Sequence, residues 1–429
     1  MQNNPDNYDH LVWHPYTQEK LSRPNIEITK ASGSSIHAKN GEIIIDAISS
    51  WWVNIHGHSH PHIAAAIAKQ AAELEHVIFA GFTHQPATLL AKNLIEMLPK
   101  GFTKVFYSDN GSTAVEVAIK MAIQFHSNAG KKIQKIIAFE NSYHGDTFGA
   151  MAVSSRGSFH EAFEDLLFEV IYLPIPTADN QNEVCKFLSD TLKKEKVAAF
   201  IYEPLLQAAG GMKMYAAEYL EKLLQIAKAH DCICIADEVL TGFGRTGYLF
   251  ASEAMETKPD IICLSKGITG GFMPLGVTVC QQHIYDAFYS DDRSKTFFHG
   301  HSYTANPIAC AAANASAELL MLPSCRENID RITARHESFS EKLMHRKSVT
   351  NIRCLGTVIA FDCVNKESTG YFNNIRDTAY QFFLSKNILM RPLGNVLYLM
   401  PPYCITDDEL VICYEAIEEF CGTLEGQHS

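Results

Sequence analysis

Two charged residues stand where predicted strands end, and their chemical types suggest one kind of reaction. Lys266 ends the apolar run DIICLSK (260–266), and Asp237 ends the apolar run CICIAD (232–237). In a parallel α/β sheet, ligands bind at the carboxyl ends of the strands. A lysine amine can form an imine with the aldehyde of pyridoxal phosphate, and a carboxylate can keep the pyridine nitrogen of this cofactor protonated. Each residue alone also has an ordinary interpretation, as a surface lysine or a helix-capping aspartate.

Two further motifs could hold the rest of such a cofactor. A phosphate needs backbone N–H groups at the start of a helix, and the segment SDNGSTAVEVAIKMA offers one. Gly111 allows close approach of the phosphate, and Ser112 adds a hydroxyl, although an ordinary Asn-Gly turn with a serine cap has the same sequence. Tyr143 follows the next predicted strand, where it could stack on the pyridine ring or be a core tyrosine. Together with Lys266 and Asp237, these motifs favour a pyridoxal phosphate site.

The candidate residues are spaced along alternating strand-like and helix-like segments. Strands are predicted at 104–109, 135–140, 197–204, 232–237 and 260–266, and helices from about Ser112 and over 217–231. Because the apolar runs are nearly continuous, the strands should be covered on both faces. Strand–helix alternation over this length predicts an α/β fold with a mostly parallel central sheet flanked by helices.

The character of the sequence changes after about residue 310. Helices are predicted at 305–322 and 327–347, short strands near 350–363 and 396–400, and a closing helix that begins at the capping-box pair Thr406 and Glu409. We therefore predict three parts. They are an N-terminal segment (1–55) that packs with the small domain, a large cofactor-binding α/β domain (56–310) and a small α+β domain (311–429).

Composition disfavours several classes of function. The chain has 429 residues and a formal net charge of -12. This net negative charge does not favour binding to nucleic acid or to an anionic membrane. The polar start lacks a targeting signal and no apolar run is long enough to span a bilayer, so a cytoplasmic protein is expected. None of the 12 cysteines forms a C-x-x-C pair, which disfavours structural zinc. The histidines of HGHSHPH (56–62) alternate with a period that fits no helical ligand pair, so we expect a polar loop and no metal.

Over nearly its whole length, the chain resembles the class III, fold-type I aminotransferases. The resemblance is carried by SDNGSTAVEVAIKMA, NSYHGDTFGAM, EPLLQAAGG, IADEVLTGFGRTG and LSKGITGG. The run DEVLTGFGRTG before SKGITGG is the most specific of these. The resemblance implies that Lys266 is the Schiff-base lysine, that Asp237 pairs with the pyridine nitrogen, that Gly111 and Ser112 bind the phosphate, that Tyr143 stacks on the ring, and that Glu203 and Gln207 lie near the cofactor.

Three more segments resemble a narrower family, the adenosylmethionine–8-amino-7-oxononanoate aminotransferases of biotin synthesis. These segments are HLVWHPYTQ, DAISSWWVNIHGHSHP and RPLGNVLYLMPPY. The family converts 8-amino-7-oxononanoate to 7,8-diaminononanoate, usually with S-adenosylmethionine as the amino donor. By resemblance, the catalytic residues are Lys266, Asp237 and Tyr16, and the substrate contacts are Tyr16, Trp51, Trp52, Tyr143, Lys266, Gly300 and Arg391.

The expected substrate pocket fits the chemistry of this acceptor. A long aliphatic chain needs an apolar, aromatic slot, and Arg391 can hold its carboxylate bidentately. Arg391 could instead be a structural ion-pair partner. Adjacent side chains in an extended segment point to opposite faces, so we expect only Trp51 of the two tryptophans to line the pocket.

The loop His299-Gly300-His301-Ser302 departs from the H-G-P-T that is usual in this family. The resemblance implies a homodimer with active sites at the interface, in which this loop crosses to the other subunit and Ser302 binds the phosphate. His301 either is neutral or alters the donor pocket, since variants that use lysine as donor carry such a loop. The double tryptophan favours adenosylmethionine over lysine.

Two broader alternatives also stay open. The protein could be another class III aminotransferase, acting on ornithine, 4-aminobutyrate or a diamine. It could also be a non-catalytic regulator or scaffold of the same fold, which would have no need to keep Lys266, Asp237 and the phosphate loop together.

Overall fold

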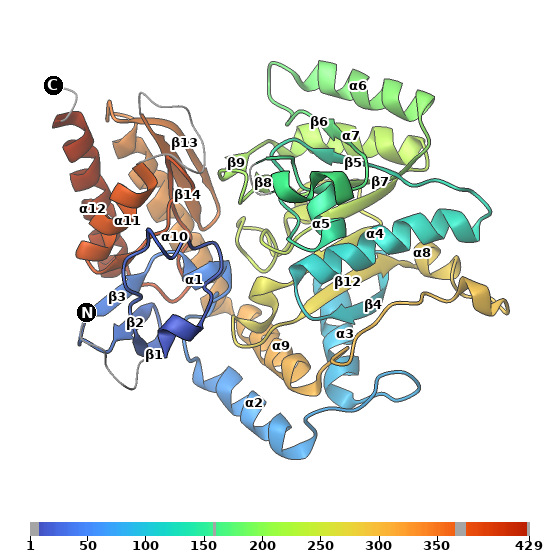
Figure 1. Ribbon diagram of the computed structural model, residues 1–429, viewed down its shortest axis with the longest axis horizontal. Coiled ribbons are helices and arrows are strands. Elements are labelled where there is room, and N and C mark those ends of the chain that lie inside the picture. Colours follow the sequence, from blue (N-terminus) through green and yellow to red (C-terminus); the bar gives the residue numbers. More distant parts are fainter. Residues whose placement is uncertain (1–7, 158–159, 365–374, 427–429) are drawn as a thin grey trace.

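A seven-stranded sheet forms the centre of the larger part of the molecule (Figure 1). The computed structural model describes residues 8–157, 160–364 and 375–426. The strand order is β4 (Phe102–Ser108), β12 (Gly276–Gln281), β11 (Ile261–Leu264), β10 (Ile233–Asp237), β7 (Val197–Tyr202), β5 (Lys135–Phe139) and β6 (Val170–Leu173). β12 is antiparallel to both of its neighbours, and the other pairs are parallel. The predicted α/β fold with a mostly parallel sheet is confirmed.

Helices cover both faces of this sheet, because its strands are apolar on both sides. One face packs against α4 (Gly111–Asn128) and α5 (Phe148–Val153). The other face packs against α3 (Gln85–Met97), α6 (Gln181–Lys194) and α7 (Ala217–Ala229). The helices predicted from about Ser112 and over 217–231 are therefore present, and the carboxyl ends of β10 and β11 stay open at one edge.

A three-stranded sheet and three helices form the smaller part of the molecule (Figure 1). The strands are β13 (Val349–Leu355), β14 (Val358–Cys363) and β16 (Val396–Leu399), and the helices are α10 (Pro323–Leu343), α11 (Ile375–Ser385) and α12 (Asp407–Gly426). The predicted capping box is confirmed, since the N–H of Glu409 donates to Thr406 Oγ1 (3.2 Å) and the N–H of Thr406 donates to Glu409 Oε2 (2.8 Å).

The N-terminal strands join the smaller part through a sheet of their own. β1 (Ile28–Ser32), β2 (Ser35–Ala38) and β3 (Ile43–Asp46) form a meander, and β3 pairs in parallel with β15 (Ile388–Leu389). This pairing supports the proposed packing of residues 1–55 with the small domain.

The helix α9 (Pro307–Leu320) bears on the proposed domain boundary. It contacts α2 (Pro61–Glu73) and α3, on the side of the large domain. A boundary at residue 310 would cut this helix, so we propose that the small domain begins with α10. Within the described ranges no single helix has the length and apolarity of a membrane span, although the bent pair of α9 and α10 passes that test together.

Short elements complete the chain. They are η1 (Asp9–Leu11), α1 (Ser49–Trp52), η2 (Glu161–Leu166), β8 (Leu206–Gln207), β9 (Lys213–Met214), η3 (Ala251–Ala254), η4 (Lys266–Thr269), α8 (Gln282–Asp286) and η5 (Arg293–Lys295). Two of them, α1 and η4, carry side chains of the candidate site.

Candidate active site

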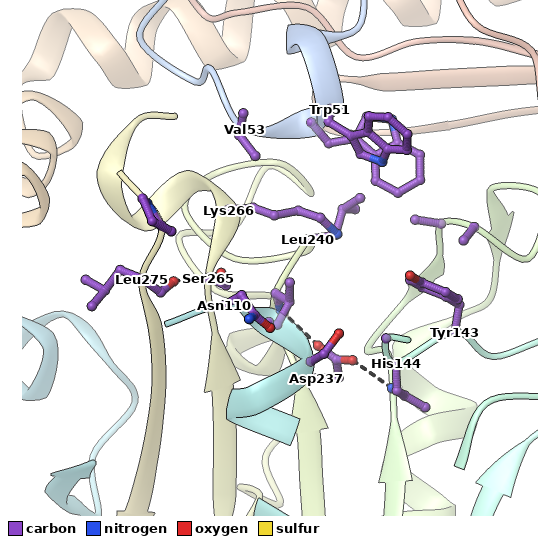
Figure 2. Close-up of a pocket in the computed structure, with 18 of the residues that line it drawn as sticks. Trp51, Val53, Asn110, Tyr143, His144, Asp237, Leu240, Ser265, Lys266 and Leu275 are labelled. Carbon is purple, nitrogen blue, oxygen red and sulfur yellow. Dashed lines mark hydrogen bonds and ion pairs between the residues drawn. The ribbon is translucent and has the colours of Figure 1, made fainter. Parts of the chain in front are cut away.

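A cavity of about 510 Å³, here called the central pocket, lies at the carboxyl ends of β10 and β11. Its lining includes eight of the residues that the sequence singled out: Lys266, Asp237, Gly111, Ser112, Tyr143, Trp51, Trp52 and Glu203. Figure 2 shows the side chains of Lys266, Asp237, Tyr143 and Trp51 around one common space. The fold thus gathers residues that are more than 200 positions apart in the sequence.

Lys266 begins η4, two residues after β11 ends. Its backbone is in the left-handed region (φ 45°), and its Nζ lies 4.9 Å from the centre of the Trp52 ring. Burial lowers the pKa of the Lys266 amine, and the carboxylates of Asp237 and Glu203 partly oppose this shift. A lowered pKa increases the uncharged fraction of the amine, which is the form that acts as a nucleophile or base.

Asp237, at the end of β10, is held by two donors from different parts of the chain. Its Oδ2 lies 2.7 Å from His144 Nδ1, and its Oδ1 accepts a hydrogen bond from the N–H of Val239 (3.1 Å). The His144 side chain is fully buried, and the backbone N–H of His144 donates to Ser154 Oγ (2.8 Å). Asp237 therefore has a fixed orientation toward the central pocket.

The start of α4 forms a cradle that fits a phosphate. Asn110 caps the helix by accepting a hydrogen bond from the N–H of Thr113 (3.0 Å), and the first N–H groups of a helix have no partner inside it. A Cβ atom on Gly111 would lie 2.8 Å from Val239 Cγ1, and a Cβ on Gly145 would lie 2.0 Å from Ser112 Oγ. Both glycines leave room at the helix start that any other residue would fill.

The other wall of the central pocket is formed by the tryptophan turn, residues 49–52. Both Trp51 and Trp52 line the pocket, so the expectation that only Trp51 does so is wrong. The reason is backbone conformation, because the segment is a tight turn rather than an extended strand. Ser49, Ser50 and Trp52 all have positive φ angles (52°, 56° and 68°), so the alternation of neighbouring side chains between two faces that holds in a strand does not apply here.

Tyr16 and Arg391 lie on the outer side of the tryptophan turn. The ring of Trp51 lies 5.6 Å from the ring of Tyr16 and 5.3 Å from Arg391 Cζ, measured between centres. The Tyr16 hydroxyl lies 3.3 Å from that of Tyr143 and donates to the carboxylate of Asp146. In the described part of the chain, no carboxylate lies within ion-pair distance of Arg391, so the alternative of a structural ion pair has no support there.

Glu203 adds an unusual carboxyl group to the central pocket. Burial raises the pKa of Glu203 to about 7, with His144 opposing the shift and Asp237 adding to it. Its oxygens accept hydrogen bonds from the N–H groups of Tyr143 (3.0 Å) and Ala208 (3.1 Å). The nearby Gln207 is buried and donates to the carbonyl of Glu140 (3.1 Å), so it supports the pocket from behind.

The structure does not bring Gly300 and Ser302 to the pocket of the same chain. Both are exposed, in the loop that follows η5, and neither is part of the pocket lining. His301 folds back on this loop, where its Nδ1 accepts a hydrogen bond from the N–H of Tyr303 (3.2 Å).

Sequence reasoning assigned no role to His144 and Asp146, which the structure places against Asp237 and Tyr16. Both belong to the segment Tyr-His-Gly-Asp (143–146), directly after the turn that ends β5. Their position at the carboxyl edge of the sheet was a usable signal, since polar residues gather there around ligands.

The histidine-rich segment 56–62 is a loop only as far as His60, because α2 begins at Pro61, and its side chains make contacts within the protein. His56 Nε2 lies 3.0 Å from the carbonyl oxygen of Ser316, and His58 Nε2 lies 2.8 Å from Asp46 Oδ2. Among the residues that the structure describes, no group of three or more histidine, cysteine or acidic side chains is arranged to hold a metal ion.

Comparison with known proteins agrees with this geometry. The family "Aminotransferase class-III" matches residues 16–421. The adenosylmethionine-8-amino-7-oxononanoate aminotransferase of Synechococcus elongatus is 46% identical and aligns over 95% of this chain and 97% of its own. The corresponding enzyme of Helicobacter pylori is 37% identical over 93% of both chains.

Solved structures show the same fold. The adenosylmethionine-8-amino-7-oxononanoate aminotransferase of Methanocaldococcus jannaschii superposes with a TM-score of 0.91 at 37% identity, over 96% of this chain and 97% of its own. An amine transaminase from an uncultivated Pseudomonas species, solved in its PLP-bound form, superposes with a TM-score of 0.88 at 30% identity, over 95% and 97%.

The residues of the central pocket fit pyridoxal phosphate, the group that is bound in the amine transaminase structure. A buried lysine of lowered pKa, a carboxylate fixed by a histidine, and a glycine-lined helix start are what pyridoxal phosphate requires at its aldehyde, ring nitrogen and phosphate. On the family match, the near-complete alignments and this pocket together, the chain belongs to the class III aminotransferases, the enzymes that use pyridoxal 5'-phosphate to transfer amino groups.

Proposed function

We propose that this protein transfers an amino group to 8-amino-7-oxononanoate and forms 7,8-diaminononanoate for biotin synthesis, with S-adenosylmethionine as the amino donor. The observation that carries the proposal is the arrangement at Trp51, whose ring has Tyr16 on one flank and the Arg391 guanidinium on another. The names of the similar enzymes from Synechococcus elongatus and Methanocaldococcus jannaschii support the same acceptor.

The side chains of the central pocket have distinct tasks in such a transfer. Bound pyridoxal phosphate supplies an electron sink that makes the C–H bond beside the amine nitrogen acidic. Lys266 Nζ, with its lowered pKa, can take up that proton and return it. Asp237, held by His144, keeps a negative charge where a protonated ring nitrogen needs one.

The acceptor matches the tryptophan wall and its arginine. Trp51 and Trp52 offer aromatic surface to an aliphatic chain, and Arg391 offers a planar fork of donors to its terminal carboxylate. Arg391 lies beside Trp51 rather than in the pocket lining, so it can bind the far end of a long substrate. This separation favours a long acid over short substrates such as 4-aminobutyrate.

Adenosylmethionine suits the same wall because its sulfonium cation can lie on an indole face. Lysine remains the second candidate donor, on the specific ground that His301 replaces the proline that is usual in this loop. Because His301 lies in the exposed loop, it can influence the choice of donor only where this loop contacts the pocket of a second subunit.

A donor test decides between these candidates. Purified enzyme loaded with cofactor is given 8-amino-7-oxononanoate and either adenosylmethionine or lysine, and 7,8-diaminononanoate is measured by mass spectrometry. We expect product with adenosylmethionine. Product with lysine alone would replace the proposed donor. Absence of product with both, together with turnover of ornithine or 4-aminobutyrate, would overturn the proposed acceptor.

We also propose a homodimer in which the loop with Gly300 and Ser302 completes the pocket of the other subunit. Support comes from exposed apolar side chains on two adjacent loops: Ile78, Phe82 and Tyr303. Asn306 Nδ2 donates to the carbonyl of Glu75 (3.1 Å), which holds these loops together. A cytoplasmic location remains a prediction, and cell fractionation is the measurement for it.

A further inference from the structure

The tryptophan turn has a backbone that needs outside support. Ser49, Ser50 and Trp52 adopt left-handed φ angles (52°, 56° and 68°), although none of them is glycine. Residues with a Cβ atom populate this region sparsely, and a run of them persists only where surrounding contacts hold it. The turn that shapes the aromatic wall is therefore not fixed by its own sequence.

Asp46 supplies that support at the start of the turn. It ends β3 and is fully buried, outside the lining of the central pocket. Its Oδ1 accepts hydrogen bonds from the N–H groups of Ile48 (3.2 Å) and Ser50 (2.9 Å), and its Oδ2 accepts one from Ser50 Oγ (3.1 Å). A carboxylate that accepts several N–H and O–H groups makes stronger hydrogen bonds than a neutral acceptor would.

His58 also contacts the carboxylate of Asp46. Its Nε2 lies 2.8 Å from Asp46 Oδ2, and the histidine side chain is mostly buried. Both carboxylate oxygens of Asp46 therefore have hydrogen-bond partners within the protein. These partners fix the orientation of the carboxylate relative to residues 49–52.

The small domain holds the side chains at both ends of the turn. Ser49 Oγ donates to the carbonyl of Met400 (2.9 Å), and Trp52 Nε1 donates to the Tyr398 hydroxyl (2.9 Å). These two contacts hold side chains of the turn. Two other groups contact its backbone: Arg245 Nη2 donates to the carbonyl of Trp52 (3.5 Å), and Asp46 accepts a hydrogen bond from the N–H of Ser50 (2.9 Å). Of these groups, Asp46 is the one that accepts hydrogen bonds from both the N–H and the hydroxyl of Ser50, a left-handed residue within the turn.

We propose that Asp46, oriented by His58, is a positioning residue that sets the affinity of the enzyme for its acceptor by holding the tryptophan turn. It touches neither substrate nor cofactor, and it acts through Trp51 and Trp52. The inference rests on the proposed function, because the acceptor is taken to bind along these two rings.

The first test separates acceptor binding from chemistry. Asp46→Asn keeps the size of the side chain and removes its charge, so the turn should populate other conformations. Because apparent affinity falls with the competent fraction, we expect KM for 8-amino-7-oxononanoate to rise about tenfold. The rate at which a saturating donor converts the cofactor should stay within about threefold of the wild-type rate. An unchanged KM would overturn the proposal.

A matched control separates positioning from general stability. Asp260 is also a buried carboxylate, paired with His283 (3.1 Å) and with the N–H of Cys234 (2.7 Å), but it lies outside the pocket lining. Asp260→Asn should lower the melting temperature without raising KM for the acceptor. An equal rise of KM in both variants would show that the effect is not specific to the turn.

A second readout needs neither activity nor cofactor. The chain has three tryptophans, so Trp13→Phe leaves only the two of the turn. In this background, Asp46→Asn should red-shift the fluorescence emission and increase acrylamide quenching, and Asp260→Asn should change neither. If the wild type proves inactive on 8-amino-7-oxononanoate, the proposed function fails, while this fluorescence still tests whether Asp46 holds the turn. Unchanged emission and quenching would overturn that role.

Discussion

At the scale of single residues, Lys266 combines a strained backbone with an amine whose pKa is lowered by burial. Lys266→Ala removes both the nucleophile and the base, so we expect turnover to fall below detection. The visible absorbance that the cofactor has when bound to a lysine should disappear as well. Activity assays and absorption spectra check this, with the exposed Lys69→Ala as control. Retained transaminase activity would refute the assignment.

Glu203 links the central pocket to the pH dependence of stability. Its pKa is raised to about 7 in the folded protein, whereas a glutamate in an unfolded chain has a pKa of about 4.3. Between these values the folded protein keeps a proton that the unfolded chain releases, so the free energy of unfolding falls as pH rises. Above about pH 7 both states are ionised, and this loss is complete.

The Glu203→Gln variant isolates this effect. Its side chain does not titrate, so cofactor-free variant protein should lose less stability between about pH 4.3 and about pH 7 than wild-type protein does. Urea unfolding at several pH values gives the two curves. If the curves stay parallel over this range, the pKa of Glu203 is not raised in the folded protein.

At the scale of elements, the sequence was informative wherever local pattern decides structure. The strand that ends at Asp237 and the strand that ends two residues before Lys266 are buried on both faces, which requires continuous apolar runs that are visible in the sequence. The start of α4 was also visible, because its cap and glycine are local. The interpretation of Trp51 and Trp52 failed because their turn depends on Asp46 and on residues of the small domain.

Contacts between elements also determine how much space is left for a phosphate at the start of α4. Gly145 (φ 132°) lies against the start of α4, and a Cβ atom there would lie 2.0 Å from Ser112 Oγ and 2.9 Å from Ser112 Cα. Gly145→Ala must therefore displace the helix start, and we expect the Kd for pyridoxal phosphate to rise at least about tenfold. Titration of cofactor-free protein measures this change.

Gly422→Ala is the matched control for this substitution. Gly422 lies in α12, and a Cβ atom there would meet nothing within 4 Å. Alanine favours a helix by about 1 kcal/mol over glycine, so this variant should be slightly more stable and bind the cofactor as the wild type does. A similar Kd for Gly145→Ala and wild type would mean that the cradle tolerates the added atom.

At the scale of the whole molecule, one chain leaves part of the predicted site unassembled. Gly300 and Ser302 lie outside the central pocket, and no local pattern could show where a second chain would place them. The exposed apolar side chains of the adjacent loops lie on the face that we propose for the dimer. Phe82 is 63% exposed there, and Leu166, far from these loops in sequence, is 71% exposed.

These two residues make a matched pair for testing the proposed dimer. Phe82→Glu puts a charge into the proposed interface, so we expect sedimentation velocity to show monomers and the activity to fall with the dimer fraction. Leu166→Glu adds the same charge at a similar exposure and should leave the dimer intact. Monomeric wild-type protein with full activity would contradict the proposed assembly.

The distance along the chain between the two supports of the tryptophan turn has a consequence for protein synthesis. Asp46 leaves the ribosome long before Tyr398 and Met400 do. A nascent chain with a finished large sheet therefore already has its lysine, aspartate and phosphate cradle, yet still lacks the completed aromatic wall. The order of synthesis therefore lets the parts that hold the cofactor form before the substrate site is complete.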